Sequence, residues 1–138
     1  MLIRYSALAT ITPSSLPRID AVEVVSLRGL KPKRVIEYMA AAKEARRVRV
    51  VGAEAQRIAE MWRALPGAEQ MRCHVPPFGL RFFAGNELIC EASICWRCNN
   101  IFGQAGADEV FFEFDGSLAA SRELLKACER ALGEAAAE

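Results

Sequence analysis

The sequence predicts an α+β domain in which an antiparallel sheet carries two to three helices packed as a single layer. Helical periodicity dominates the first half of the chain, and β-rich segments separated by turn signals dominate the second half. A last helical stretch closes the sequence. Separate runs of helices and hairpins are typical of α+β proteins, whereas regular alternation of strand and helix would predict a doubly wound parallel sheet.

The expected elements have recognisable signals at their ends. Pro32 suits a first helical turn because its missing N–H needs no partner there, and Gly133 suits a helix end. Gly85-Asn86 is a hairpin signal, because glycine readily adopts positive φ in a tight turn. Residues 1–20 predict a short strand or arm that ends in a loop. Strands are expected at residues 21–27, 48–51, 69–75, 80–84, 87–96 and 109–114, and helices at residues 32–47, 53–65 and 118–132.

Size and composition predict one globular domain over residues 1–138. The chain is 52% hydrophobic and 25% charged, which is typical of a compact protein rather than a disordered one. A chain of this length buries roughly two thirds of its unfolded surface, so folding requires neither a metal nor a disulfide.

The net charge of +1 indicates no particular partner, but the charge is unevenly distributed. Residues 1–69 carry 12 basic and 7 acidic side chains, and residues 70–138 carry 6 basic and 10 acidic ones. The basic excess could face nucleic acid or an acidic protein, or it could be a solvated helix whose cations complement the helix dipole. We favour the helix, and expect no nucleic-acid partner, because no aromatic residues are interleaved to stack on bases. The basic residues are Lys31, Lys33, Arg34, Lys43, Arg46, Arg47 and Arg49.

The cysteines predict a reducing compartment. Their odd number, five, argues against a closed set of structural disulfides. Arg4 makes residues 1–17 a poor signal peptide, and no apolar run approaches the roughly 18 residues that a membrane span requires. We therefore expect a cytoplasmic protein with free or metal-bound thiols and no membrane association.

Residues 72–100 hold four of the five cysteines and the only histidine, and a zinc site is the first functional hypothesis for them. Cys73 and His74 precede the Cys95-x-x-Cys98 pair by twenty residues, a separation that zinc ribbons also use. These four residues are the candidate metal ligands. Adjacent residues of a strand point to opposite faces, however, so Cys73 and His74 can share an ion only if the strand ends before Pro76.

Thiol redox chemistry is the second hypothesis. Cys95-Trp-Arg-Cys98 has the spacing of disulfide oxidoreductases, and Arg97 could favour a thiolate. In such enzymes the first cysteine begins a helix, whereas the two asparagines and Gly103 that follow here predict a loop. A regulatory disulfide stays an alternative.

Inert packing is the third hypothesis, because cysteine is among the most often buried residues. If residues 87–96 form a regular strand, Cys90 shares the apolar face with Ala92, Ile94 and Trp96. Cys95 then lies on the other face with Ile89, Glu91 and Ser93. Cys128 falls on the apolar stripe of the last helix, so Cys90 and Cys128 are expected in the core.

His74 could be a metal ligand or a general base. No serine or carboxylate partner stands beside it in the sequence, although the fold could supply one. A nucleophile pair of adjacent cysteine and histidine is geometrically awkward, because a base must reach the thiol that it activates. Without a glycine-rich phosphate loop or a serine nucleophile elbow, the sequence predicts no catalytic residue and leans toward a non-catalytic protein.

The same segment carries a family resemblance. Residues 72–82 read Arg-Cys-His-x-Pro-x-x-Gly-Leu-Arg-Phe and residues 93–100 read Ser-Ile-Cys-Trp-x-Cys-Asn-Asn, a core that resembles a group of small uncharacterised bacterial proteins. The similarity covers residues 52–103. The resemblance implies a bacterial source and one domain, and it implies no activity.

Protein binding, as an adaptor or an immunity-type inhibitor, is the function expected from these observations. The loop after Cys95 combines aromatic, cationic and amide side chains, which include types that dominate binding at protein interfaces. We expect another protein as the partner, and no cofactor other than a possible zinc ion. The candidate partner-binding residues are Trp96, Arg97, Asn99, Asn100 and Phe102.

Overall fold

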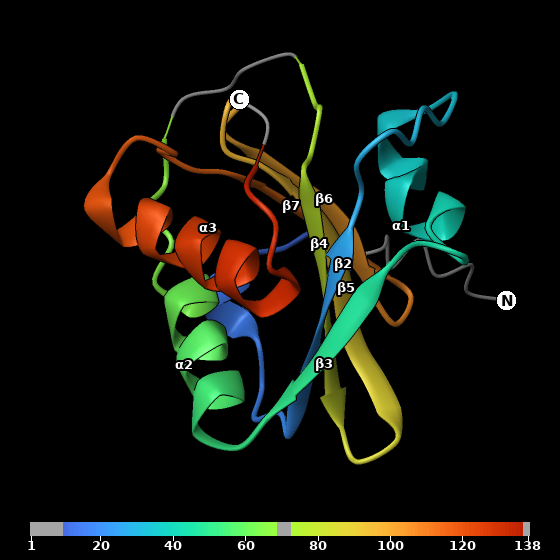
Figure 1. Cartoon of the computed structure of the whole chain (residues 1–138). Coiled ribbons are helices and arrows are strands. Elements are labelled where there is room, and N and C mark those ends of the chain that lie inside the picture. The colour runs from blue at the N-terminus through green and yellow to red at the C-terminus, as the bar shows by residue number, and fades with distance from the viewer. Residues whose placement is uncertain (1–9, 69–72, 137–138) are drawn as a thin grey trace, which may run out of the picture.

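Seven described strands form one open, mostly antiparallel sheet in the order β1-β7-β6-β5-β4-β2-β3 (Figure 1). The computed structural model describes residues 10–68 and 73–136. The strands are β1 (Thr10–Ile11), β2 (Ala21–Ser26), β3 (Arg47–Val51), β4 (Phe78–Ala84), β5 (Glu87–Cys95), β6 (Asn100–Ala105) and β7 (Asp108–Glu113). The helices are η1 (Pro13–Ser15), η2 (Val35–Glu37), α1 (Tyr38–Ala41), α2 (Gly52–Arg63) and α3 (Ala119–Leu132). The predicted α+β class is confirmed.

The two long helices, α2 and α3, lie side by side on one face of the sheet (Figure 1). Helix α2 turns Ile58, Ala59 and Trp62 inward at helical spacing, and all three are buried. From the sheet, alternate residues of β2, such as Val22 and Val24, enter the same core. This layer contains most of the buried apolar side chains of the described chain and supplies the main hydrophobic stabilisation.

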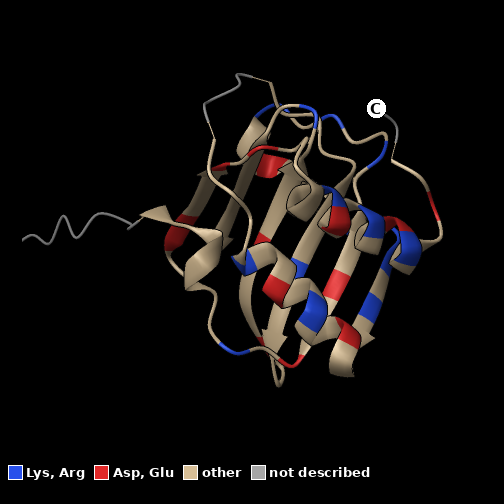
Figure 2. Cartoon of the chain, turned by 90° about the vertical axis from the view of Figure 1, so that its left-hand side faces the viewer, with Lys and Arg blue, Asp and Glu red and all other residues tan. Residues whose placement is uncertain are grey.

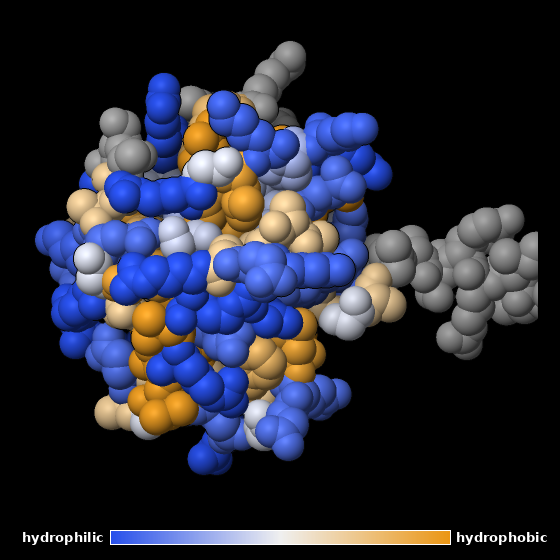
Figure 3. Space-filling model, turned by 45° about the vertical axis from the view of Figure 1, so that its right-hand side comes forward, coloured by the Kyte–Doolittle hydropathy of each residue, from blue (hydrophilic) through white to orange (hydrophobic). Residues whose placement is uncertain are grey.

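The other face of the sheet is covered only in part, by η2 and α1 (Figure 1). Val25, Leu27 and Ala42 form a second, small core there. A Cβ at Gly79 would lie 2.3 Å from the sulfur of Met39, so glycine lets α1 approach the strand closely. On this side of the molecule, apolar and hydrophilic residues are interspersed over the surface (Figure 3).

The helix predicted at residues 32–47 is much shorter than its periodicity indicates. Only η2 and α1 are helical, because Arg47 already begins β3 opposite Val25 of β2. The Arg47 guanidinium donates hydrogen bonds back to the carbonyl oxygens of Ala42, Lys43 and Ala45, which satisfies groups that the end of the helical stretch leaves free. Pairing of β3 with β2 therefore outweighs the helical propensity of these residues.

Strand β6 is not predicted from the sequence, because Asn99, Asn100 and Gly103 are typical of loops. It nevertheless pairs with β5 on one side and β7 on the other. Gly103 is required there, since a Cβ would lie 2.0 Å from the carbonyl oxygen of Glu91. Of the strand predicted at residues 69–75, residues 69–72 lie outside the described part of the chain, and residues 73–75 are not in a strand.

The basic residues of the first half are partly neutralised by acidic neighbours. Arg46 lies 3.0 Å from Glu134, and Arg47 and Arg49 lie 3.9 and 3.7 Å from Glu23. On the helix-covered side, charges of both signs are interspersed over α2 and α3 (Figure 2). None of the described helices combines the length and the hydrophobicity that spanning a bilayer requires.

Candidate functional site around the Cys73–Cys98 disulfide

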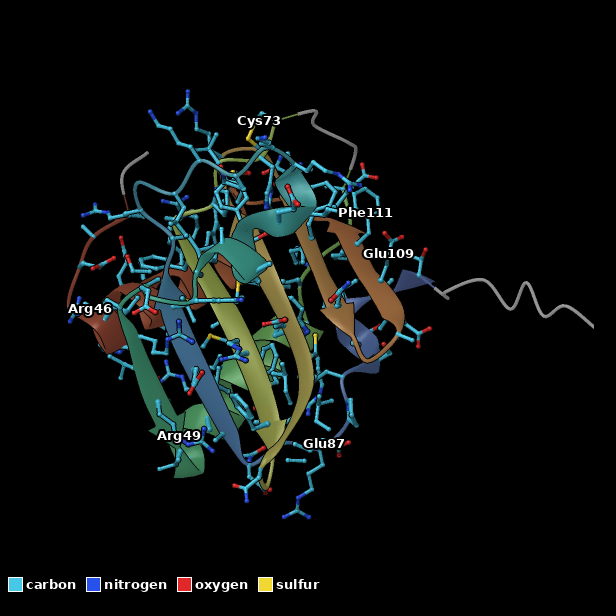
Figure 4. All side chains as sticks on the ribbon, turned by 90° about the vertical axis from the view of Figure 1, so that its right-hand side faces the viewer. Arg46, Arg49, Cys73, Glu87, Glu109 and Phe111 are labelled. Carbon is cyan, nitrogen blue, oxygen red and sulfur yellow. A yellow bond between two sulfur atoms is a disulfide. The ribbon has the colours of Figure 1, made fainter. Side chains whose placement is uncertain are left out.

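Cys73 and Cys98 form a disulfide at one end of the sheet, with their Cα atoms 5.4 Å apart (Figure 4). Cys73 lies in the segment before β4, and Cys98 lies in the turn between β5 and β6. Cys73 is exposed and Cys98 is fully buried. The bond therefore ties a segment without secondary structure to the turn that joins β5 and β6.

Cys95 is a free, buried cysteine beside this disulfide. Its sulfur accepts a hydrogen bond from the backbone N–H of Cys98 at 3.1 Å and another from Val75 at 3.4 Å. The predicted pair of Cys95 with Cys98 is thus replaced by a bond between Cys73 and Cys98, and the Cys95 thiol is hydrogen-bonded to the backbone of Cys98 and of Val75. The structure thus bonds two cysteines of the predicted set to each other and places the third against the backbone of the same region.

His74 turns away from its neighbour Cys73 and lies buried in a hydrogen-bonded chain. Its Nδ1 lies 2.6 Å from Oδ1 of Asn100, and its Nε2 lies 2.7 Å from Oγ of Ser93. The Asn100 amide nitrogen donates to the carbonyl oxygen of Cys73, which fixes the amide orientation. Nδ1–H therefore donates to Asn100, and Nε2 of the neutral ring accepts from the Ser93 hydroxyl, whose single hydrogen is shared with the carbonyl oxygen of Phe102.

The His74 ring is neutral at pH 7. Burial lowers its pKa from 6.5 to about 4, against a smaller opposing effect of the hydrogen bond to Asn100. The rings of Tyr38 and Phe102 pack edge-on against the imidazole, with centroids 5.5 and 4.7 Å away. These contacts explain why the imidazole is shielded from water.

A hydroxyl, an imidazole and an amide that are hydrogen-bonded in series form the arrangement of an activated nucleophile. Here the Ser93 side chain is only 1% exposed and lies 3.2 Å from the carbonyl oxygen of Phe102. A substrate carbonyl would have to reach Ser93 through the packed side chains around it. The chain of hydrogen bonds is better suited to holding the segment of Cys73 and His74 against the sheet than to acyl transfer.

The four candidate metal ligands are not arranged around one point. In the described part of the chain, no group of three or more histidine, cysteine or acidic side chains is placed to hold a metal ion. Cys73 and Cys98 are bonded to each other, and both His74 nitrogens are engaged by Asn100 and Ser93. A zinc ion would therefore require both reduction of the disulfide and a new orientation of His74.

The predicted partner-binding residues divide into buried and accessible groups. Trp96 is 4% exposed, its indole N–H donates to the carbonyl oxygen of Ser121 at 2.8 Å, and Asn100 is 2% exposed. These two side chains stabilise the fold and cannot contact a partner directly. Arg97 is exposed, and Asn99 and Phe102 are partly exposed.

Strand alternation assigns Cys90 correctly, and helical periodicity assigns Cys128 correctly. Cys90 and Cys128 are buried in the core between the sheet and the long helices, as predicted. Burial raises the pKa of the Cys90 thiol to about 12 and raises that of Cys128 further, so both stay protonated at neutral pH. Ile89 departs from the prediction: a register shift between β4 and β5 lets it pack against the same core as Cys90.

The partners of His74 are the part of the site that sequence reasoning missed. Ser93 and Asn100 are 19 and 26 residues away in the chain, and the fold brings both to the imidazole. The only available signal is that both belong to the same unusual segment as Cys95 and Cys98. No protein-family model, no curated protein and no solved structure matches this chain.

The disulfide predicts how many free thiols the oxidised protein contains and how much less stable a variant without the bond is. Denatured oxidised protein should titrate three thiols, from Cys90, Cys95 and Cys128, and reduced protein five. The bond closes a loop with a sequence separation of 25, so its loss in a Cys73→Ser/Cys98→Ser variant should cost about 3 kcal/mol in urea unfolding. A Cys90→Ser variant with the disulfide intact serves as the control for thiol counting. Five thiols without reductant would contradict the assignment.

His74 predicts a loss of stability in mild acid. Its folded pKa of about 4 lies below its ordinary value of 6.5, so the unfolded chain binds the proton more readily between these values. Stability is therefore complete above pH 6.5 and falls as the pH drops toward 4, by at most roughly 3 kcal/mol. Urea midpoints measured over this range should show the fall in wild-type protein and a smaller one in His74→Gln, because the chain has one histidine. Equal pH dependence of the two proteins would refute the assignment.

Proposed function

We propose that this chain is a non-catalytic, disulfide-locked protein-binding domain, of the adaptor or immunity type, and that it binds its partner through Ile36, Phe102 and Phe111. The observation that carries the proposal is an aromatic patch on the incompletely covered face of the sheet. Phe102 of β6 and Phe111 of β7 are opposite each other, with ring centroids 5.2 Å apart. Ile36 lies beside them and is 46% exposed.

The composition of the patch resembles the centre of a small protein–protein interface. The three apolar side chains surround a hollow of about 120 Å³, whose rim includes Gln104 and Glu109. Both aromatic rings are partly exposed, and Phe111 and Glu109 lie on β7 at the side of the sheet away from β3 (Figure 4). Aromatic anchors with a polar rim are typical of the part of an interface that contributes most affinity. A partner with one protruding apolar side chain and a neighbouring hydrogen-bond donor fits this surface.

The disulfide region supports the patch mechanically. Phe102 packs against the His74 ring, and His74 is fixed by Asn100 and by the segment that the disulfide ties down. A ring held in one position loses less conformational entropy on binding than a free one. In this proposal the buried polar network does not react with a substrate but maintains the shape of the binding surface.

Because of the Cys73–Cys98 disulfide, we propose an oxidising compartment instead of the reducing cytoplasm. The odd cysteine number suggests the cytoplasm, but structural disulfides persist mainly in oxidising compartments. The three remaining cysteines are buried and two of them have a raised pKa, so free thiols here are compatible with an oxidising environment.

Site-specific photo-crosslinking tests the patch. A photoreactive amino acid at Ile36 should crosslink one discrete protein in cells that express the chain, and the same amino acid at Ala120, exposed on α3, should not. Phe111→Glu should lower the crosslinked yield from position 36 at least roughly tenfold, because a charge in the apolar centre of an interface is poorly tolerated. Unfolding midpoints should show that both variants remain folded. Equal crosslinking from positions 36 and 120, or a yield that Phe111→Glu leaves unchanged, would exclude this surface.

Thiol–disulfide exchange is a second candidate function, favoured by the position of Cys95. Its sulfur accepts hydrogen bonds from Cys98 and Val75, which lie on either side of the disulfide. Attack of the Cys95 thiolate on the Cys98 sulfur would form a Cys95–Cys98 bond and release Cys73 as a thiolate, which takes up a proton from water. The released thiol would be exposed, whereas the other two sulfurs stay buried.

Alkylation without reductant tests this exchange. If it occurs, iodoacetamide at about pH 8.5 should label Cys73, and peptide mapping should find a Cys95–Cys98 disulfide in the same molecules. A Cys95→Ala variant should leave Cys73 unlabelled. If Cys73 of the wild type is labelled no faster than that of Cys95→Ala, the disulfide is a static lock.

A further inference from the structure

A row of polar side chains, most of them charged, crosses the incompletely covered face of the sheet and ends at its β3 edge. The residues are opposite one another in successive strands, and their charges alternate toward that edge. Arg81 of β4 lies 3.1 Å from Glu23 of β2 and 3.2 Å from Glu91 of β5. Arg49 of β3 lies 3.7 Å from Glu23. From β7 to β3 the row is Glu109, Gln104, Glu91, Arg81, Glu23 and Arg49.

Positive charge is in excess at the β3 end of this row. Glu23 is shared by three guanidinium groups, because Arg47 also lies 3.9 Å from it. Among the described residues, the ion pairs around Glu23 and Glu91 thus join three arginines to only these two carboxylates. The Arg49 and Arg81 guanidinium groups also flank the Phe83 ring, 4.9 and 5.5 Å from its centroid. Arg49 is therefore held against the sheet at its outer edge (Figure 4).

The backbone of β3 is available on its outer side. Within the described chain, β3 has a neighbouring strand only on the β2 side, and it is paired there over five consecutive residues. Ser26 N–H donates to the carbonyl oxygen of Arg46, so even-numbered residues of this stretch direct their backbone groups toward β2. Arg47 and Arg49 then direct both of theirs outward, and Val51 directs its N–H outward, because its carbonyl oxygen begins the hydrogen bonding of α2. A regular edge of this length, without proline or bulge, is a template for another strand.

We propose that the β3 edge binds an extended strand of a partner protein in which acidic and apolar residues alternate. Acidic side chains of the added strand would face Arg47 and Arg49 and continue the alternation of charge across the sheet. Apolar side chains would point to the other face, where Val48 and Val50 pack against the main core. Strand addition of this kind takes affinity from backbone hydrogen bonds and specificity from alternate side chains.

Charge selects this occupant over a second copy of the chain. In an antiparallel pair of two β3 edges, arginines of one copy would lie opposite or diagonal to arginines of the other, which is destabilising. The proposal is independent of the patch at Ile36, Phe102 and Phe111, because Phe102 and Phe111 lie on β6 and β7, toward the opposite side of the sheet, with Ile36 of η2 beside them.

Two synthetic peptides of about eight residues test the proposal, one alternating valine with glutamate and one alternating valine with lysine. Fluorescence anisotropy should give the glutamate peptide roughly tenfold higher affinity for the wild-type protein. Arg49→Gln should reduce this preference and Arg49→Glu should reverse it. Amide hydrogen exchange should slow at Arg47, Arg49 and Val51 when the glutamate peptide is bound.

Controls separate the edge from the rest of the molecule. Phe111→Glu should leave peptide affinity unchanged, so failure of the patch and failure of the edge are distinguishable. Equal affinity for both peptides, a preference that Arg49→Gln leaves undiminished, or protection outside β3 would overturn the proposal. So would concentration-dependent protection of β3 amides without peptide, since a second copy would then be the occupant.

Discussion

The pairing of β5 with β4 on one side and β6 on the other determines where every group of the candidate site lies. Alternation along β5 sends Cys90, Ala92 and Ile94 toward the long helices, and it sends Ser93 and Cys95 to the opposite face. The turn that follows β5 then carries Cys98 to Cys73 and begins β6 with Asn100. A slip of one residue in this pairing would exchange the two faces and separate His74 from both of its hydrogen-bond partners.

Residues 73–77 have no secondary structure of their own and depend on this end of the sheet. The backbone groups of such a segment must find partners elsewhere when they are buried. Cys73 O accepts from Asn100, Val75 N–H donates to the Cys95 sulfur, and Pro77 O accepts from Leu27. The disulfide therefore acts together with a set of polar contacts, and the Tyr38 ring covers the histidine at its centre.

Sequence patterns predicted the parts of this fold that depend on local periodicity. Residues of α2, α3 and β5 show clear periodic signals, and the structure has these elements close to the expected bounds. The shortness of α1 and the presence of β6 were not predicted. Pairing of β3 with β2 ends the helical stretch early, and pairing with β5 and β7 makes β6 a strand, in both cases against the local propensity of the residues.

Local periodicity was also insufficient to predict the candidate functional site. Alternation correctly separated Cys90 from Cys95, but it holds only inside a strand, and Cys73 and Cys98 both lie outside one. The two cysteines meet because the segment before β4 approaches the turn between β5 and β6. No spacing of residues in the sequence encodes this approach. The burial of Trp96 has a similar origin, because the partner of its indole N–H is Ser121 of α3, 25 residues away.

The disulfide encloses β4, β5 and the turn between them in one covalent ring. Tension applied to the two ends of the chain would pass through the sulfur–sulfur bond and would bypass these central strands. The bond replaces 25 residue steps by a Cα–Cα distance of 5.4 Å, so a fully stretched chain would be about 77 to 85 Å shorter than its residue number implies, given a reach of roughly 3.3 to 3.6 Å per residue. The ring would also keep the two halves of the protein joined after a single proteolytic cut in the β4–β5 hairpin.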